Sequence, residues 1–200
     1  MSARSPQELE PSSRRRVPAA QRREELIEAA VVEFARGGLH GTPVGDVARR
    51  VGVAQPYVFS LFANKRELFL AAVEAGFARV EDTFRAAAAA YERGEAPAEA
   101  DGPLKAMGLA YFEMVRTDRT ALMLQHQSYA ACEDEVVRER VRALFARLVE
   151  TARELSGADD EDLDGFIRQG MACNVAAALD VEDLSTGSSW VGAELAAERR

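Results

Sequence analysis

The stretch from Thr42 to Leu68 restricts the possible folds of this chain more than any other part. It reads TPVGDVARRVGVAQPYVFSLFANKREL. Thr42 is a favourable N-cap residue, and Pro43 suits the first turn of a helix, where no backbone N–H is needed. The apolar residues that follow at helical spacing are Val44, Val47, Ala48 and Val51. Gly52 then stops the pattern, as expected of a residue that readily takes positive φ just past a helix end.

A second short helix is predicted to begin near Pro56, because proline pushes Gln55 out of the α region and places it close to the N-cap. Val58 and Phe62, four residues apart, give this helix one buried face. The residues left pointing elsewhere, and therefore available for contacts, are Gln55, Tyr57 and Ser60.

A third helix is predicted to follow directly. Asn64 and Glu67, three residues apart, form the pattern of a capping box. Lys65 lies in the first turn, where a cation opposes the helix dipole, so this lysine is expected to have another role.

Two short helices across a glycine turn indicate a helix-turn-helix, whose second helix enters the major groove of DNA. On spacing alone, a helical hairpin that serves only as core is the alternative. The segment resembles the DNA-binding domain of the TetR family of transcriptional regulators over about residues 22–75. The residues that carry the resemblance, after a helix with a glycine-rich end, are Thr42, Val47, Ala48, Gly52, Val53, Phe59, Phe62, Lys65 and Leu68.

This resemblance implies a DNA-binding surface. Its expected members are Thr42, Gln55, Pro56, Tyr57, Phe59, Ser60 and Lys65. Gln55 and Tyr57 are expected to face bases, and Thr42 and Lys65 to contact phosphates. Two positions depart from the family pattern: Ala54 stands where the family usually has serine, and Phe59 where it usually has a phosphate-binding tyrosine. We therefore expect Tyr57 to take over a phosphate or base contact.

The charge distribution agrees with a DNA-binding N-terminal part. The formal net charge is −8, but residues 1–80 carry 12 Lys or Arg against 9 Asp or Glu, whereas the remainder carries 13 against 24. Positive charge is thus concentrated where phosphate neutralisation needs it.

The rest of the chain predicts an all-α fold, since no alternating strand pattern appears. We expect a disordered basic arm at residues 1–20, the helix-turn-helix domain at 21–68, a larger helical ligand-binding and dimerisation domain at 69–184, and a tail at 185–200. One long helix from Lys65 to the alanine run at 86–90 joins the two domains. The other helices are predicted at 21–37, 103–117, 119–131, 134–155 and 162–180.

Bulky, adaptable side chains recur at helical spacing in the second half. They are Met107, Tyr111, Met114, Met123, His126 and Tyr129, with Asn174 among the polar groups nearby. The simplest interpretation of such stripes is hydrophobic core. The TetR-like resemblance instead implies a pocket for a small-molecule effector, with an apolar wall and a few polar groups. It also implies a homodimer on a palindromic operator.

Other functions have less support in the sequence. A Gly-rich phosphate loop, GxSxG and HExxH are absent, and His40 and His126 are the two histidines, so we expect no enzyme, metal or cofactor. Cys132 and Cys173 are expected to be buried free thiols, with a disulfide or redox pair as the alternative. No apolar run reaches the length of a membrane helix, and we expect a cytoplasmic protein.

We therefore predict a ligand-responsive, homodimeric DNA-binding transcriptional regulator, most simply a repressor. The alternative is a helical adaptor or small-molecule-binding protein that does not read DNA. An adaptor predicts no salt-sensitive affinity for DNA.

Overall fold

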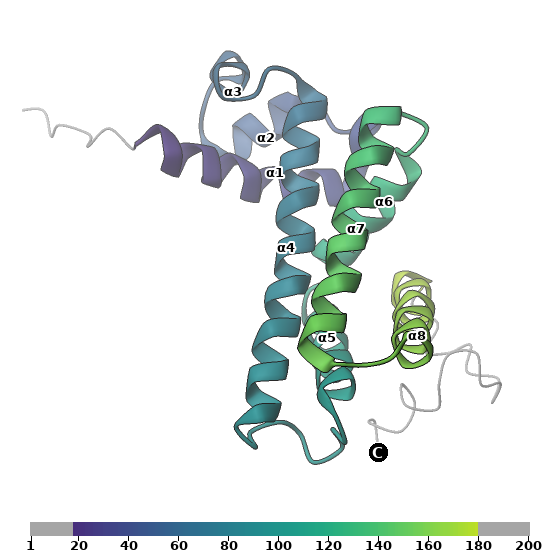
Figure 1. Cartoon of the computed structure of the whole chain (residues 1–200). Coiled ribbons are helices and arrows are strands. Elements are labelled where there is room, and N and C mark those ends of the chain that lie inside the picture. The colour runs from purple at the N-terminus through teal and green to yellow at the C-terminus, as the bar shows by residue number, and fades with distance from the viewer. Residues whose placement is uncertain (1–17, 180–200) are drawn as a thin grey trace, which may run out of the picture.

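The computed structural model describes residues 18–179, and all their regular structure is helical (Figure 1). The helices are α1 (Ala19–Gly41), α2 (Val44–Val51), α3 (Gln55–Leu61), α4 (Lys65–Glu92), α5 (Pro103–Thr117), α6 (Thr120–Ala130), α7 (Glu135–Ser156) and α8 (Asp160–Leu179). The all-α prediction is confirmed for these residues. The predicted tail at 185–200, and all but the last three residues of the predicted arm at 1–20, lie outside the described residues.

The helix-turn-helix forms with the predicted turn. Gly52 ends α2 with φ 73° and ψ 32°, and the N–H of Val53 donates to the carbonyl of Ala48 at 2.9 Å. This pattern satisfies a terminal carbonyl of α2, and the left-handed conformation is one that glycine takes without a Cβ penalty. α3 then begins at Gln55 with proline in its first turn.

The prediction that Thr42 caps α2 is wrong. The N-cap is Pro43, and no side chain caps this helix. The Thr42 hydroxyl instead donates to the carbonyl of Glu33 in α1 at 3.2 Å. Thr42 is 4% exposed, so its side chain holds α1 against the start of α2.

The capping box at α4 is confirmed in its main bond. The Asn64 side-chain oxygen accepts from the N–H of Glu67 at 2.9 Å. The Glu67 carboxylate reaches back to the N–H of Ala63 rather than to that of Asn64. Two free N–H groups at the start of α4 are thereby satisfied.

Loss of this cap is expected to have a modest effect. Asn64→Ala leaves the N–H of Glu67 without its acceptor and should lower the free energy of unfolding by about 1 kcal/mol. Asn64→Ser retains a capping oxygen and should stay close to the parent in urea denaturation. Equal losses for both variants would contradict the capping role.

α1 is longer than the predicted helix at residues 21–37, and it is interrupted just after the point where that helix was predicted to end. Helical geometry extends to Gly41, yet Gly38 has φ 63° and ψ −174° and interrupts the helix. An added Cβ at Gly38 would overlap the side-chain amide of Gln127, so α6 lies directly against this kink.

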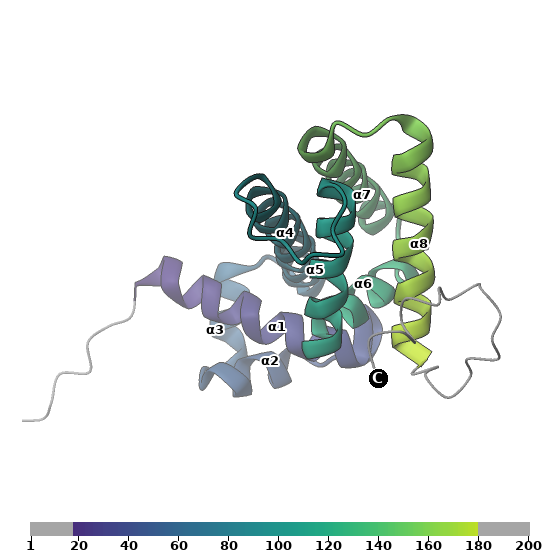
Figure 2. The same ribbon diagram turned by 90° about the horizontal axis from the view of Figure 1, so that it is seen from below.

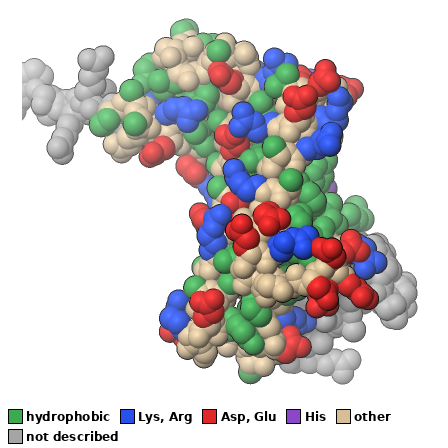
Figure 3. All heavy atoms as spheres, viewed as in Figure 1, with side chains coloured by type: hydrophobic (Ala, Val, Ile, Leu, Met, Phe, Trp, Pro, Cys, Tyr) green, Lys and Arg blue, Asp and Glu red, His purple; other side chains and the backbone are tan. Residues whose placement is uncertain are grey.

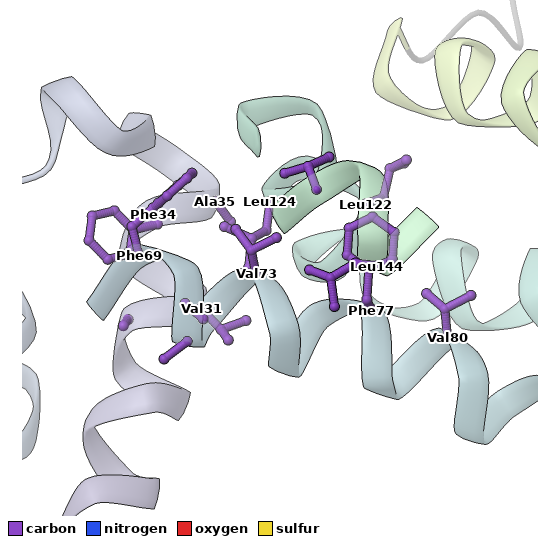
Figure 4. Close-up of a cluster of buried hydrophobic side chains, with 14 of the residues drawn as sticks. Val31, Phe34, Ala35, Phe69, Val73, Phe77, Val80, Leu122, Leu124 and Leu144 are labelled. Carbon is purple, nitrogen blue, oxygen red and sulfur yellow. The ribbon is translucent and has the colours of Figure 1, made fainter. Parts of the chain in front are cut away.

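α4 joins the two parts of the molecule without a break. Its 28 residues contact α1, α5, α6 and α7. Figure 4 shows its side chains Phe69, Val73, Phe77 and Val80 between side chains of α1, α6 and α7, within one continuous buried cluster. Phe69 packs edge-to-face on Phe34 of α1, with ring centroids 5.1 Å apart. The predicted domain boundary at residue 68 therefore falls inside a helix whose core residues serve both sides.

The remaining helices build the larger part beside α4. Helices α1 to α3 lie at one end of α4, α5 and α7 run beside the rest of α4, and α6 packs against both α1 and α4 (Figures 1 and 2). α8 lies at the side of this bundle against α5, α6 and α7. The predicted bounds of α5 match the observed ones, and those of α6, α7 and α8 agree within two residues.

Candidate DNA-binding surface and effector cavity

α3 separates one buried face from one exposed face. Val58 is completely buried and Phe62, directly after the helix, is 2% exposed. The guanidinium of Arg23 from α1 lies 4.8 Å from the centre of the Phe62 ring, which adds a cation–π contact to the packing. The predicted contact residues on the helix are exposed: Gln55, Pro56, Tyr57, Phe59 and Ser60. Five of the seven predicted DNA-binding residues therefore share one accessible helix.

Two aromatic rings dominate the exposed face. Tyr57 is 38% and Phe59 43% exposed, an unusual display of large apolar area on a helix of seven residues. The Ser60 hydroxyl donates to the carbonyl of Tyr57 at 2.7 Å, so its proton is already used within the helix. The Gln55 side-chain oxygen lies near Gly45 of α2, where an added Cβ would approach it to 3.2 Å.

Lys65 has a partner that accounts for a cation at a helix start. Its ammonium group donates to the carbonyl of His40, near the C-terminal end of α1, at 3.1 Å. Partial burial lowers the pKa of Lys65. The negative end of the α1 dipole thus offsets the unfavourable position of Lys65 on α4. Thr42, by contrast, is withdrawn from the surface, and its buried, engaged hydroxyl removes it from the DNA contacts that we propose.

Neighbouring arginines are already paired with carboxylates. Arg49 bonds to Asp46 at 2.9 Å, and Arg50 bonds to Glu33 at 2.7 Å. On the face seen in Figure 3, basic and acidic side chains are interspersed. Residues 18–80 carry eight Lys or Arg against seven Asp or Glu, whereas residues 1–17 carry four against two. Most of the basic surplus therefore lies in residues 1–17 and not in residues 18–80.

The turn between α6 and α7 contacts the first turn of α4, directly after the helix-turn-helix. Asp134 caps α7 by accepting from the N–H of Val136 at 3.0 Å, and it also forms a 2.9 Å ion pair with Arg66 in the first turn of α4. The hydrogen bond from Arg66 holds the pKa of Asp134 below its usual value. Together with the contact of Gln127 at Gly38, this ion pair connects the α6–α7 turn to α1 and α4.

A cavity of about 1070 Å³ opens between α4, α5, α7 and α8. Four phenylalanines from these four helices form much of its apolar wall: Phe84, Phe112, Phe145 and Phe166. Phe84 packs edge-to-face on Phe166, with ring centroids 5.5 Å apart. The size and the apolar lining are those of a site for a small organic molecule.

One part of the cavity wall carries a chain of hydrogen bonds. The Tyr111 hydroxyl donates to the Asn174 side-chain oxygen at 2.6 Å, and the Asn174 amide donates to the Gln125 side-chain oxygen at 3.4 Å. Gln125 in turn donates to the Tyr129 hydroxyl at 2.7 Å. Burial raises the pKa of both tyrosines, so the hydroxyls remain protonated and neutral.

The sequence predicted two of the lining residues, Tyr111 and Asn174. The other five predicted residues do not line this cavity, because their side chains lie elsewhere. Met107 is completely buried in the core, Met114 accepts a weak hydrogen bond from Thr83, and His126 bonds to the carbonyl of Leu122 at 3.1 Å. Tyr129 lies behind Gln125, and Met123 packs on the core.

The phenylalanine wall was not predicted from the sequence. Phe84 falls on the apolar stripe of α4, and Phe112, Phe145 and Phe166 belong to no motif of the sequence. An apolar stripe does not separate a core side from a cavity side, because both are apolar.

Other chemistries have no site among the described residues. Neither Cys132 nor Cys173 forms a disulfide within the described residues, both are half-buried rather than buried, and Cys173 lines the cavity. Within residues 18–179 no cluster of three or more potential ligands could hold a metal ion. In the same part of the chain, no helix is both long enough and apolar enough to span a membrane.

The family model matches the helix-turn-helix region, and a curated relative matches a segment of similar length. The model of bacterial regulatory proteins of the tetR family matches residues 26–72. The HTH-type transcriptional activator FasR of Mycolicibacterium smegmatis is 36% identical over 59 residues, which cover 30% of this chain and 27% of that protein. The chain thus spans about a quarter of the length of the curated relative that it matches.

Solved structures resemble the whole fold. FadR from Bacillus subtilis, in complex with stearoyl-CoA, has a TM-score of 0.62 at 13% identity, over 86% of this chain and 94% of that one. A TetR-like transcriptional regulator from Rhodococcus sp. RHA1 has a TM-score of 0.53 at 21% identity, over 81% and 85%. Residues 26–72 therefore match the DNA-binding domain of bacterial regulatory proteins of the tetR family, and the fold of the described residues resembles that of these solved transcriptional regulators.

Proposed function

We propose that the protein is a ligand-responsive transcriptional repressor that binds a palindromic operator as a homodimer. The observation that supports it best is α3, a helix anchored by Val58 and Phe62 whose opposite face exposes Gln55, Tyr57 and Phe59. Two such helices, one from each subunit, would enter successive turns of the major groove.

The exposed residues suggest different roles on DNA. Gln55 offers an amide that can bond two positions of an adenine edge, once it leaves Gly45. The Tyr57 hydroxyl reaches a base or a phosphate, and Phe59 provides apolar contact with a thymine methyl group or a sugar. Lys65 would exchange the carbonyl of His40 for a phosphate, because a charged acceptor forms the stronger bond.

α8 is the proposed dimer surface. Val175 is 41% and Leu179 63% exposed, so apolar area remains uncovered at its C-terminal end. Among the small residues near them, Gly170 and Ala172 remain half-exposed and would let a second helix approach closely, whereas Ala176 is 3% exposed and packs within the subunit. Sedimentation velocity would detect the dimer.

α6 provides a route from the cavity to the DNA-binding domain. Gln125 lies on the cavity wall, and Gln127, two residues further, lies against the kink of α1 at Gly38. Residues two apart point to different sides of a helix, so one helix contacts both places. A ligand that shifts α6 would move α1 and α4 together. It must favour one arrangement by a few kcal/mol, since equal affinity for both arrangements changes nothing.

DNA binding can be tested by fluorescence anisotropy with DNA upstream of the gene for this protein, over a range of salt concentrations. Tyr57→Ala should weaken the preferred site by about 1–3 kcal/mol and relax specificity if Tyr57 contacts bases. Lys65→Ala should weaken all sequences similarly and reduce the salt slope by about one phosphate. Arg142→Ala, an exposed change on α7 and outside the helix-turn-helix, is the matched control and should bind like the parent.

Two results would exclude the proposed DNA recognition. The first is that the protein binds all DNA sequences equally, and the second is that the Tyr57→Ala and Lys65→Ala variants both bind the preferred DNA as tightly as the parent. A reporter gene behind the bound site then separates repression from activation. Higher expression after deletion of the regulator supports repression, and lower expression would make it an activator.

A further inference from the structure

The charges around the cavity differ between its two ends. The charged lining residues are Asp101, Lys105, Asp159, Glu161, Asp162 and Arg168. Five of them are exposed and Lys105 is half-buried, and four of the six are carboxylates. Arg168 is already paired with Asp164 at 3.1 Å. An anion that enters this end therefore meets a surplus of negative charge.

The other end of the cavity is polar but uncharged. Asn174 is 4% exposed, and Tyr111 and Gln125 are each 9% exposed, so all three polar side chains are more than nine-tenths buried. Gly102 is the N-cap of α5, and Tyr111 lies nine residues further within the same helix. This separation corresponds to about 14 Å along α5. A ligand of this length would reach from the charged rim to the amide and hydroxyl groups.

The buried groups retain free hydrogen-bonding capacity. Asn174 has two amide N–H groups, and among the described residues one of them is used, in the bond to Gln125. The Tyr111 oxygen donates its proton to Asn174 and keeps acceptor lone pairs. These groups can donate to a carbonyl or hydroxyl oxygen and accept from a hydroxyl proton. They provide no cation for a carboxylate or phosphate, whose burial without a partner is far more costly.

We propose that this cavity selects an uncharged, mainly apolar molecule that carries a hydroxyl or carbonyl group bound by Asn174 and Tyr111. The proposal rests on the proposed effector function of the same cavity. The phenylalanine wall binds the apolar body, and the carboxylate-rich rim disfavours anions.

A matched series of naphthalene derivatives tests this selection by isothermal titration calorimetry on the full-length protein. The probes are 2-naphthol and 2-acetylnaphthalene, which are uncharged, with 2-naphthoate, 2-naphthylmethylammonium and unsubstituted naphthalene. We expect the two uncharged polar probes to bind about tenfold more tightly than naphthalene, from one or two additional hydrogen bonds. The carboxylate should bind at least a hundredfold more weakly than 2-naphthol.

Two variants locate the effect. Asn174→Leu has nearly the same side-chain size and should make 2-naphthol and naphthalene bind equally, while Tyr111→Phe should reduce the preference for 2-naphthol about threefold. Tyr57→Phe removes a tyrosine hydroxyl from the exposed face of α3 and should leave all ligand affinities unchanged. Circular dichroism would show whether Asn174→Leu unfolds. In that case the proposal is tested by the probe affinities of the Tyr111→Phe variant and of the parent protein.

The outcomes separate this proposal from the proposed function. The proposed ligand class is overturned if 2-naphthoate or 2-naphthylmethylammonium binds more tightly than 2-naphthol. It is also overturned if neither uncharged polar probe binds. Operator binding measured on the same preparation tests the regulator independently. If 2-naphthol binds as expected but leaves operator affinity unchanged, the ligand class is supported, and the proposed coupling between the cavity and DNA binding is wrong.

Discussion

Phe62→Ala is expected to lower the free energy of unfolding by about 3–5 kcal/mol, because it removes a buried aromatic ring and leaves a cavity behind. Phe62 is 2% exposed, anchors the end of α3, and carries the guanidinium of Arg23 over its ring. The variant should therefore also lose operator binding. Urea denaturation followed by circular dichroism measures the first effect, and fluorescence anisotropy the second.

Phe59→Ala is the matched control on the same segment. Its ring is 43% exposed, so its removal should change stability by no more than about 0.5 kcal/mol while weakening DNA binding. The two phenylalanines, three residues apart, thus separate anchoring from recognition. Equal destabilisation by both changes would mean that the division of α3 into a buried and an exposed face is wrong.

The sequence determined the helices well because local signals mark their ends. Gly52 and Asn64 stand at helix termini as predicted, Gly157 likewise ends α7 in a left-handed conformation, and a long apolar pattern predicted α4. Thr42 was misjudged because the same hydroxyl can cap the next helix or bond across to the previous one. The choice depends on tertiary packing, because α1 must lie close enough for the backbone carbonyl of Glu33 to accept a hydrogen bond from the Thr42 hydroxyl.

The candidate sites were predictable to different degrees. The exposed face of α3 follows from the positions of Val58 and Phe62 alone, since the remaining side chains of a short helix must point away from them. The cavity depends on how four helices pack, and periodicity does not show which apolar residues leave a space between them. Met107 and Tyr111 illustrate this limit: both are buried on α5, but the first fills the core and the second lines the cavity.

Loss of the cations around Glu81 is expected to have the second large effect on stability, because Glu81 is a buried carboxylate on α4, the helix that joins the two parts of the molecule. Its side chain is 4% exposed and bonds to Arg147 of α7 at 2.7 Å and to Arg85 of α4 at 3.0 Å. The double change Arg85→Ala with Arg147→Ala leaves this carboxylate without a cation. It should lower the free energy of unfolding by about 3 kcal/mol, measured by urea denaturation at neutral pH.

The matched control is the pair of Glu74 and Arg140, which also joins α4 to α7 but is about half exposed on both sides. Arg140→Ala should cost no more than about 1 kcal/mol, because water solvates the carboxylate that remains.

A third variant distinguishes an unpaired charge from lost packing. Adding Glu81→Leu to the double change removes the buried carboxylate and should restore most of the stability, since an apolar side chain of similar size needs no partner. If the triple variant is as unstable as the double one, the arginine stems stabilise by packing on α4 and α7, and the charge of Glu81 is not the cause. If it is restored, the instability of the double variant comes from the unpaired charge of Glu81 and not from lost packing. The double variant then tests whether α4 transmits changes from the cavity, because a loosened contact between α4 and α7 should weaken the response of DNA affinity to the ligand.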